Sequence, residues 1–522
     1  MKKFFEKILI TVLILLMTIL LTGCNNKTTN TNILTNQPKN ESENKETIKG
    51  DTSNFDITFL KMENQKANKI YSPLSIKYAL KMLEEGTEGE SKLQISNVLG
   101  NRTLKKYNSN SNMAFANALF VKDLYENKIK NNYISTLKTQ YNAEVKVDSF
   151  SNPNNLNSWV SNKTLNLING LFEEVDENTV FMLINALAID MDWEDKFIKN
   201  EHPVGCWYEH EKFDWVGPEN PTEHKFGENS QKVSGMEIIA SINNYDIVKE
   251  IGEANIRETV KNEFKKWAKN LGEESFKQEF NKDLTDNNIE EEANKYLETY
   301  IPEINSNYKR VDYTTDFSIY VDNNIKVFAK DLKEYNGTTL QYIGIMPTTE
   351  DLDNYIKNID EAEIDNIINK LKDLKVENFK SGVVTKITGY IPKFKFEYEL
   401  NLQKDLQQLG ITNVFEEGKA NLTGICDDKD TYITDAAHKA NIEFTQDGIK
   451  AAAATWTGAA GAGSPFDYLY DVPVEEIDLT FDKPYMFLIR DKEDGTIWFV
   501  GTVYEPLLYN EDTTIGEGSK SR

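Results

Sequence analysis

Three residues near the middle of the chain have the spacing of metal ligands. His202, Cys206 and His210 are four residues apart, so a helix would place them on one face. Pro203 and Gly205 stand between them and argue against a helix. We therefore expect no metal site here, and the rest of the sequence implies no cofactor.

Two other kinds of chemistry are also poorly supported. Gly458, Gly461 and Gly463 resemble a phosphate-binding loop, but no strand leads into them at the required spacing and no helix with a lysine follows. None of the 4 histidines lies in a Ser-His-Asp or Cys-His motif. The sequence therefore does not indicate an enzyme.

The segment that begins at Gly448 is patterned for burial as a β-strand. Side chains of a strand alternate between two faces. If Ile449 faces inward, that face is small or apolar and uncharged, while Lys450 and Trp456 fall on the other face. The inward residues are Ile449, Ala451, Ala453, Thr455, Thr457 and Ala459, and the outward ones are Lys450, Ala452, Ala454 and Trp456. This alternation predicts a loop that can enter a sheet as a new strand.

The alanine run also has a plainer interpretation. Alanine is the best helix former, and taken alone residues 451–454 are more typical of a helix end or an ordinary loop. The sequence around the run decides between the two interpretations.

Length and charge restrict the class of protein. The chain has 522 residues with 39% hydrophobic content, enough for one large core or two to three ordinary domains. It carries 59 basic and 84 acidic residues, a net charge of -25. Such a surface repels phosphates, so we expect no nucleic-acid partner.

The first residues form a targeting segment. Lys2, Lys3 and Lys7 precede an apolar run from Ile8 to Leu21, and the next residues are Thr22-Gly23-Cys24. This ending resembles the lipobox of bacterial lipoproteins, which predicts a signal peptide at 1–23 and a lipid on Cys24. The alternative is an uncleaved transmembrane anchor. Either way, we expect the bulk of the chain outside the cytoplasmic membrane, with residues 24–52 as a flexible tether.

The body, from 53 to 508, mixes helices and strands, and a tail follows at 509–522. Ser72-Pro73 is a typical helix start, whereas Asn117–Val121 and Val180–Ile189 are typical of buried strands. Helices dominate the first third and strands the last, so the predicted class is α+β. Amphipathic, highly charged helices are predicted at about 246–310, as an insertion between strand-rich parts.

Eight segments of this body resemble serpin segments and occur in serpin order. They run from about residue 54 to 508, outside the helical block. In the segment Asp482–Ile489, Tyr485 stands where the family usually has phenylalanine. The segments are Asn68–Ile76, Asn117–Phe120, Asn157–Val160, Leu183–Ala186, Ile391–Phe394, Leu409–Thr412, Asp482–Ile489 and Val500–Val503.

The resemblance implies a fold and a function. The fold would have three β-sheets, about nine helices and an exposed reactive loop. The function would be a suicide-substrate inhibitor, monomeric, that traps an extracellular serine protease, or a cysteine protease, by inserting the cleaved loop into the central sheet. The implied hinge is Gly448, Ile449, Lys450, Ala451, Ala452, Ala453, Ala454 and Thr455.

The position of the cleaved bond stays open. The usual hinge length places it at Ala462-Gly463, which suits subtilisin-like or elastase-like proteases. The stretch from Gly448 to Pro484 is about ten residues longer than usual, however. Cleavage near Phe466, Tyr468 or Leu469 would suit chymotrypsin-like proteases instead.

The resemblance also implies a polar cluster that latches the central sheet. Its members carry over as Ser72, Ser75, Asn185 and His438, together with Trp193. Buried polar groups need partners, so a mutually bonded cluster that rearranges on insertion would act as a two-state latch. Taken alone, His438 is equally well explained as a single structural histidine.

Other readings stay open at the level of sequence. The chain could be a non-inhibitory serpin-like protein that binds ligands or assists folding, although such members tend to have charged or bulky hinge residues. The helical block could offer a partner-binding face or simply be a solvated surface. Cys206 and Cys426 could form a disulfide, but sequence alone cannot show that they meet.

Overall fold

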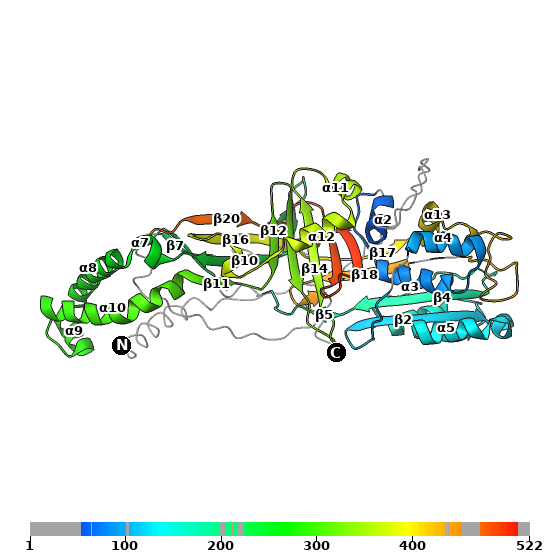
Figure 1. Cartoon of the computed structure of the whole chain (residues 1–522), viewed down its shortest axis with the longest axis horizontal. Helices are drawn as coiled ribbons and strands as arrows, with labels where there is room; N and C mark the ends of the chain where they lie inside the picture. The colour runs from blue at the N-terminus through cyan, green and yellow to red at the C-terminus, as the bar shows by residue number, and fades with distance from the viewer. Residues whose placement is uncertain are drawn as a thin grey trace, which may run out of the picture.

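The computed structural model describes residues 54–63, 65–100, 104–176, 178–197, 204–209, 212–216, 224–434, 436, 438–449 and 470–509, without side chains in the two short segments 204–209 and 212–216. The molecule is elongated, with a helical arm at one end and a helix-covered sheet at the other (Figure 1). Within these residues, no helix has the length and apolar character needed to cross a membrane.

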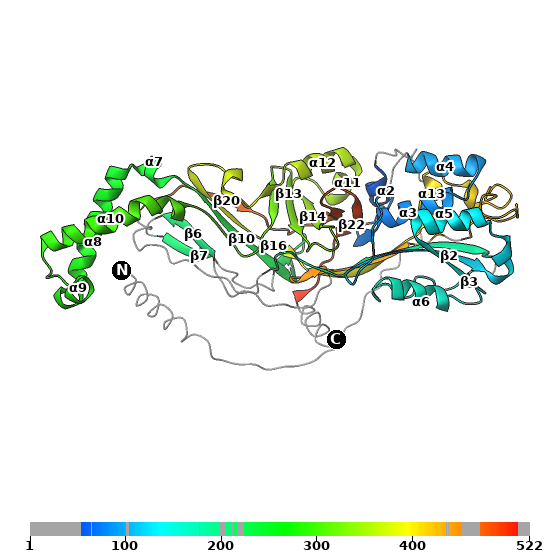
Figure 2. The same ribbon diagram turned by 60° about the horizontal axis from the view of Figure 1, so that its bottom comes forward.

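The N-terminal part of the body alternates helices with the strands of a three-stranded sheet. Ser72 caps the helix α3, because its side chain accepts a hydrogen bond from the Ser75 N–H, and Pro73 occupies the first turn of that helix. The elements are α2 (Phe55–Met62), β1 (Lys69–Tyr71), α3 (Pro73–Glu84), α4 (Gly89–Leu99), β2 (Met113–Lys122), η2 (Asp123–Lys128), α5 (Asn131–Tyr141), β3 (Ala143–Asp148), α6 (Asn154–Lys163) and β4 (Phe181–Ile189). Figure 2 shows the β3-β2-β4 sheet between α6 on one face and α3 to α5 on the other.

A seven-stranded antiparallel sheet forms the middle of the molecule, in the order β1-β22-β21-β14-β13-β12-β15. All residues of β14 and β22 are buried, as expected for strands covered on both faces. The strands after β1 are β12 (Ser318–Val321), β13 (Ile325–Asp331), β14 (Leu340–Pro347), β15 (Lys372–Asp373), β21 (Tyr485–Asp491) and β22 (Ile497–Val503). The helices α11 (Leu352–Asn358) and α12 (Glu361–Asn369) and the 3-10 turn η3 (Val376–Asn378) follow in this part of the chain, whereas α13 (Leu402–Gln408) lies beside α4 at the helix-covered end (Figure 1) and is followed by the 3-10 turn η4 (Asn413–Phe415).

A second sheet, in the order β11-β10-β16-β20, leads toward the arm. Its strands are β10 (Gly235–Asn244), β11 (Lys309–Tyr313), β16 (Val383–Pro392) and β20 (Val474–Asp478), of which β20 runs parallel to β16. Two small hairpins precede it, β6 (Val204–Glu209) with β7 (Lys212–Val216) and β8 (His224–Phe226) with β9 (Gln231–Val233).

The arm is an insertion at the tip of the β10–β11 hairpin. It consists of α7 (Ile247–Ile251), α8 (Glu253–Leu271), α9 (Glu273–Phe280) and α10 (Asp286–Tyr308). Its two ends meet where the Tyr245 N–H donates to the Tyr308 carbonyl (3.1 Å). The four helices enclose a hydrophobic core of their own, which includes Ile256, Phe264 and Leu297. We call α7 to α10 the helical arm.

The central sheet is divided into two halves. One half is β3-β2-β4, and the other is β17-β18-β19-β5. The second half consists of β5 (Met191–Asp192), β17 (Phe394–Leu400), β18 (His438–Phe444) and β19 (Gly448–Ile449).

The predicted α+β class is confirmed by these elements, although their numbers differ from the expectation. The described residues form six sheets, because the central sheet is divided and two hairpins stand apart. They also form helices α2 to α13, of which the four helices of the arm are additional to the body.

Candidate functional site

Within the described part of the chain, no pairing joins β4 directly to β18, and we call the space between these two strands the slot. β4 pairs along one edge with β2, and β18 pairs along one edge with β17. Among the described residues, only the two-residue strand β19 lies between the halves. At the far end, Thr179, just before β4, and Thr434, shortly before β18, share a hydrogen bond of 2.8 Å. The described residues give β4 and β18 no partner along the rest of their facing edges, and a strand placed between them could pair with both.

The predicted hinge begins inside this slot. After Phe444 the chain turns tightly, and the Thr445 N–H and hydroxyl both donate to the Gly448 carbonyl (3.1 Å each). Ile449 then pairs with Phe444 of β18 on one side and with Met191 of β5 on the other. Both residues of β19 are buried. The remaining hinge residues, Lys450 to Thr455, lie outside the described residues.

The wall formed by β18 alternates in the same way as the predicted loop. His438, Ala440, Ile442 and Phe444 are buried, while the residues between them are partly exposed. On the exposed face, Lys439 and Glu443 form ion pairs with Glu397 and Lys395 of β17. The slot therefore has one apolar, buried side and one charged, solvated side.

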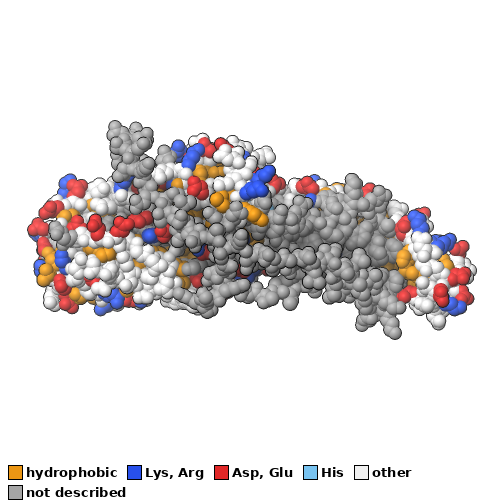
Figure 3. Space-filling view, turned by 180° about the vertical axis from the view of Figure 1, so that it is seen from behind, with side chains coloured by type: hydrophobic (Ala, Val, Ile, Leu, Met, Phe, Trp, Pro, Cys, Tyr) orange, Lys and Arg blue, Asp and Glu red, His pale blue; other side chains and the backbone are white. Residues whose placement is uncertain are grey.

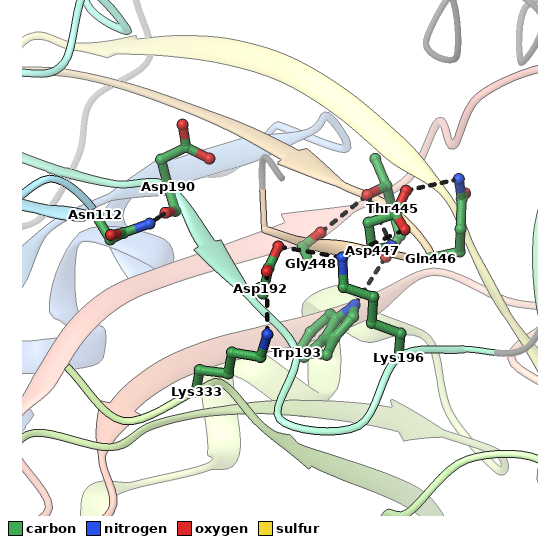
Figure 4. A network of polar contacts seen from close by, with 10 residues as sticks. All are labelled: Asn112, Asp190, Asp192, Trp193, Lys196, Lys333, Thr445, Gln446, Asp447 and Gly448. Carbon is green, nitrogen blue, oxygen red and sulfur yellow. Dashed lines mark hydrogen bonds and ion pairs between the residues drawn. The ribbon is translucent and has the colours of Figure 1, made fainter. Parts of the chain in front are cut away.

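Trp193 holds the hinge turn at the mouth of the slot (Figure 4). Its indole Nε1–H donates to the Thr445 carbonyl (2.9 Å), and its backbone N–H donates to the Asp447 carbonyl (3.1 Å). The Trp193 ring is fully buried and packs edge-on against Phe444, with 5.3 Å between ring centroids. One residue thus ties the end of β5 to the turn from which the loop starts.

Charged residues add a second link at the mouth of the slot. The Lys196 ammonium lies 3.4 Å from Asp192 and 3.7 Å from Asp447, so it joins β5 to the hinge turn. Lys333 lies 3.3 Å from Asp192 (Figure 4). The sequence analysis did not find these links, because Asp447 is distant from Lys196 along the chain and Asp192 is distant from Lys333.

A buried lysine lies beneath Trp193. Lys330 donates to the Thr315 hydroxyl (2.5 Å) and the Asp316 carbonyl (2.6 Å), and its ammonium lies 4.9 Å from the Phe197 ring centroid. Burial lowers the pKa of Lys330 to about 8. The sequence offered no signal for this residue beyond a lysine within an apolar strand.

The structure brings three of the five predicted latch residues together. His438 Nε2 accepts a hydrogen bond from the Ser72 N–H (2.9 Å), and the Ser72 hydroxyl accepts one from the Ser75 N–H (3.1 Å). Burial of the imidazole lowers the pKa of His438 to about 4. Trp193 lies apart from them, at the hinge turn.

Asn185 has a different partner. Its amide donates to the side chain of Asn117 on β2 (2.7 Å), and Asn117 in turn donates to the Tyr141 carbonyl (2.7 Å). The Asn185 oxygen is buried and has no hydrogen-bond partner among the described residues. Such a group is costly to leave unpaired, so Asn185 is available to a partner that enters or closes the slot.

The remaining predicted site residues fall largely outside the described part. These are Cys24 and the candidate cleavage residues Ala462, Gly463, Phe466, Tyr468 and Leu469. Cys426 is a buried free thiol, 3.6 Å from the Thr431 hydroxyl. Only the backbone of Cys206 is described, in β6.

Comparison with known proteins agrees with this geometry. A sequence model of the serpin (serine protease inhibitor) family matches residues 52–211 and 313–506, leaving out the helical arm. Human neuroserpin is 24% identical over 475 residues, covering 86% of this chain and 89% of that protein. Human leukocyte elastase inhibitor is 23% identical over 475 residues, covering 87% and 97%.

A solved structure shows the same fold. Tengpin, a thermophilic serpin in its native state, superposes with a TM-score of 0.56 at 20% identity, covering 90% of this chain and 97% of that one. The segments that predicted the family lie in the two family-matched ranges, and one of them, Leu183–Ala186, belongs to β4 at the edge of the slot. The chain belongs to the serpin family.

Proposed function

We propose that this chain inhibits an extracellular serine protease, or a cysteine protease, by acting as its suicide substrate. The observation that carries the proposal is β19, a two-residue strand that pairs with β18 on one side and with β5 on the other at the mouth of the slot. It supports a loop that continues into the slot once it is cut. The name of the leukocyte elastase inhibitor relative agrees with an inhibitory function.

The two strand registers indicate where each hinge residue would go. Ile449 pairs with Phe444 and with Met191, and antiparallel partners move by equal steps in opposite directions. Continuing both registers by two residues sets Ala451 between Ile442 and Ile189. The next inward positions are Ala453 between Ala440 and Leu187, and Thr455 between His438 and Asn185. Small side chains therefore meet the buried side of the slot at each inward position.

The protease carries out the bond cleavage, and loop insertion in the inhibitor supplies the free energy that traps the protease. The protease serine attacks the carbonyl of the cleaved bond, an ester forms, and the new amino terminus leaves with the C-terminal part of the loop. The freed hinge then enters the slot, where each new backbone hydrogen bond contributes about 1 kcal/mol. Insertion carries the attached protease along and distorts it before water hydrolyses the ester. This division of labour needs no cofactor and no catalytic residue in the inhibitor.

Incubation with three proteases tests the proposal. The body from residue 54 onward is mixed with subtilisin, elastase and chymotrypsin, and denaturant-resistant complexes are sought. We expect each trapped protease molecule to be joined to one inhibitor molecule, and mass spectrometry of this complex identifies the cleaved bond. Cleavage at Ala462-Gly463 would agree with subtilisin or elastase, and cleavage near Phe466 or Tyr468 with chymotrypsin. Cleavage without any complex would favour the non-inhibitory alternative.

The proposed location is the outer face of a bacterial cell membrane. The observation that supports this location is that the apolar run ends in Leu21-Thr22-Gly23-Cys24. We expect the mature chain to begin at a lipid-modified Cys24, and Cys24→Ser to keep the apolar run uncleaved. Mass spectrometry of the mature N-terminus checks this. Retention of Met1 in the parent chain, or an unmodified Cys24, would contradict it.

A further inference from the structure

The chain that follows the reactive loop is buried against the helical arm. Tyr470 is 9% exposed and Val472 is 4% exposed, and both belong to the same hydrophobic cluster as Ile256, Phe264 and Leu297 of the arm. The Pro473 carbonyl also accepts a hydrogen bond from the Val384 N–H (2.9 Å). Residues 470–472 therefore pack in a hydrophobic cluster that they share with the arm and with Val384 of β16.

The next residues are held along β16. β20 pairs with it over five residues, and the Leu479 N–H donates to the Thr388 carbonyl (2.8 Å). Asp478 forms an ion pair with Lys326 (2.8 Å). A side chain at Gly389 would lie 2.3 Å from the Leu479 backbone, so the two segments are in close contact. Residues 470–479 thus form one continuous, anchored segment.

Chain length limits what an uncut loop can do. If residues 450–459 filled the slot down to the level of Phe181, residues 460–469 would have to return to Tyr470. Ten extended residues span at most about 36 Å. The nine residues of β4 alone span about 30 Å.

The return path is longer than β4. Figures 1 and 2 place β4 at one end of the molecule and the helical arm at the other, with β5 between them. The returning chain would have to cover the whole length of β4 and then the distance from β5 to the arm. An uncut loop can therefore fill the slot only if Tyr470, Val472 and β20 leave their places.

We propose that the helical arm is a clamp that makes loop insertion depend on cleavage. While the loop is intact, burial of Tyr470 and Val472 in the arm keeps the distal end in place and the slot unfilled. A cut anywhere between Ile449 and Tyr470 separates the hinge from the clamp, and the hinge is then free to insert. This inference rests on the proposed inhibition by loop insertion.

The arm is suited to such a role because the distal segment shares its hydrophobic cluster. Its two ends are held together by the backbone hydrogen bond between Tyr245 and Tyr308 and by Asp246, which accepts from Asn305 (3.1 Å) and Lys309 (3.0 Å). Acidic and basic side chains are interspersed over its tip (Figure 3), and its lysines form ion pairs such as Lys265 with Glu290 (2.6 Å). The charged surface of the arm is therefore solvated, and the proposed clamp depends on the hydrophobic cluster beneath it.

The test measures spontaneous conversion of the uncut chain without any protease. The body from residue 54 is warmed, and the fraction that becomes resistant to high urea is followed with time, with mass spectrometry to verify that the chain is intact. In the double variant Tyr470→Ser with Val472→Ser, we expect conversion at least about tenfold faster than in the parent. Conversion at the parental rate would overturn the clamp.

Two further variants sharpen the result. Phe280→Ala removes a ring that packs on Phe276 in α9 (4.7 Å between centroids), at the end of the arm far from β20 (Figure 1), and should convert at the parental rate. Equally fast conversion of this variant would overturn a specific clamp at Tyr470. Replacing residues 246–307 by Asn-Gly removes the clamp outright and should accelerate conversion even if the double variant does not fold.

The outcome is separable from that of the inhibition assay. If the variants convert faster but the parent traps none of the three proteases, the clamp stands and the proposed inhibition of those enzymes fails. If the parent traps protease and the variants convert at the parental rate, inhibition stands and the clamp fails.

Discussion

Replacing Ala451 or Ala453 with arginine is expected to change the protein from an inhibitor into a substrate. If the register of β19 continues after cleavage, Ala451 would face Ile442 and Ala453 would face Ala440, and both of these β18 residues are buried. An unpaired guanidinium buried there costs several kcal/mol, which slows insertion but not attack on the loop. The protease then hydrolyses the ester and leaves. The number of inhibitor molecules consumed per protease inactivated should rise about tenfold or more.

A neighbouring position provides the matched control. Ala452→Arg adds the same charge and volume, but on the inserted strand its side chain would fall on the opposite face, where Lys439 and Glu443 of β18 are partly exposed and paired with Glu397 and Lys395. It should trap protease nearly as efficiently as the parent. If both inward arginines trap protease as well as the parent does, insertion is not the mechanism. If all three variants fail alike, the alternation of the loop is not what matters.

Acidification is expected to weaken the sheet through His438. The His438 Nε2 accepts from the Ser72 N–H, which requires an unprotonated nitrogen, and burial lowers the pKa of His438 from 6.5 to about 4. Between these values the unfolded chain binds a proton that the native protein does not. Stability from this group is therefore complete above pH 6.5 and is lost as the pH falls toward 4, by about 3 kcal/mol in total.

The measurement is the onset temperature of polymerisation and the urea midpoint at several pH values from 7.5 to 4. Other carboxylates also titrate, so the informative quantity is the difference between the parent and His438→Gln. The glutamine oxygen can accept from Ser72 without titrating, so its pH dependence should be flatter in this window. His438→Ala should lower the onset at neutral pH, since it removes an acceptor worth about 1 kcal/mol. Identical pH profiles for the parent and the glutamine variant would exclude His438 as the acid-sensitive group.

Several elements could be predicted because their signals are local. Ser72-Pro73 is a cap and a first-turn proline, and it begins α3. The apolar run ending at Ile189 is β4, and the periodic apolar residues Ile256, Val260 and Phe264 lie on the buried face of α8. These patterns follow from backbone geometry with periods of two and 3.6 residues, so they are readable without a partner.

The partners of the site residues could not be predicted from the sequence, for a physical reason. The bond between Ser72 and His438 joins residues 366 positions apart, and Asn185 turned out to bond Asn117 on the neighbouring strand. A polar residue in an apolar segment indicates that its side chain needs a hydrogen-bond partner, but it does not identify that partner. Lys196 and Lys333 carried no such signal, since a lysine in a sequence usually means a solvated side chain.

The sequence by itself determined the family, the α+β class, the separate helical block and the alternation of small residues in the loop, because each depends on residue types at short spacing. Only the tertiary structure decided that the described parts of β4 and β18 are not paired with each other, that β19 pairs with β5 and β18 between them, and that Tyr470 and Val472 share a hydrophobic cluster with the arm. Those facts depend on which distant segments share a core or an edge. Burial and strand pairing between such segments are set by the free energy of the whole packed molecule, and no local pattern along the chain encodes them.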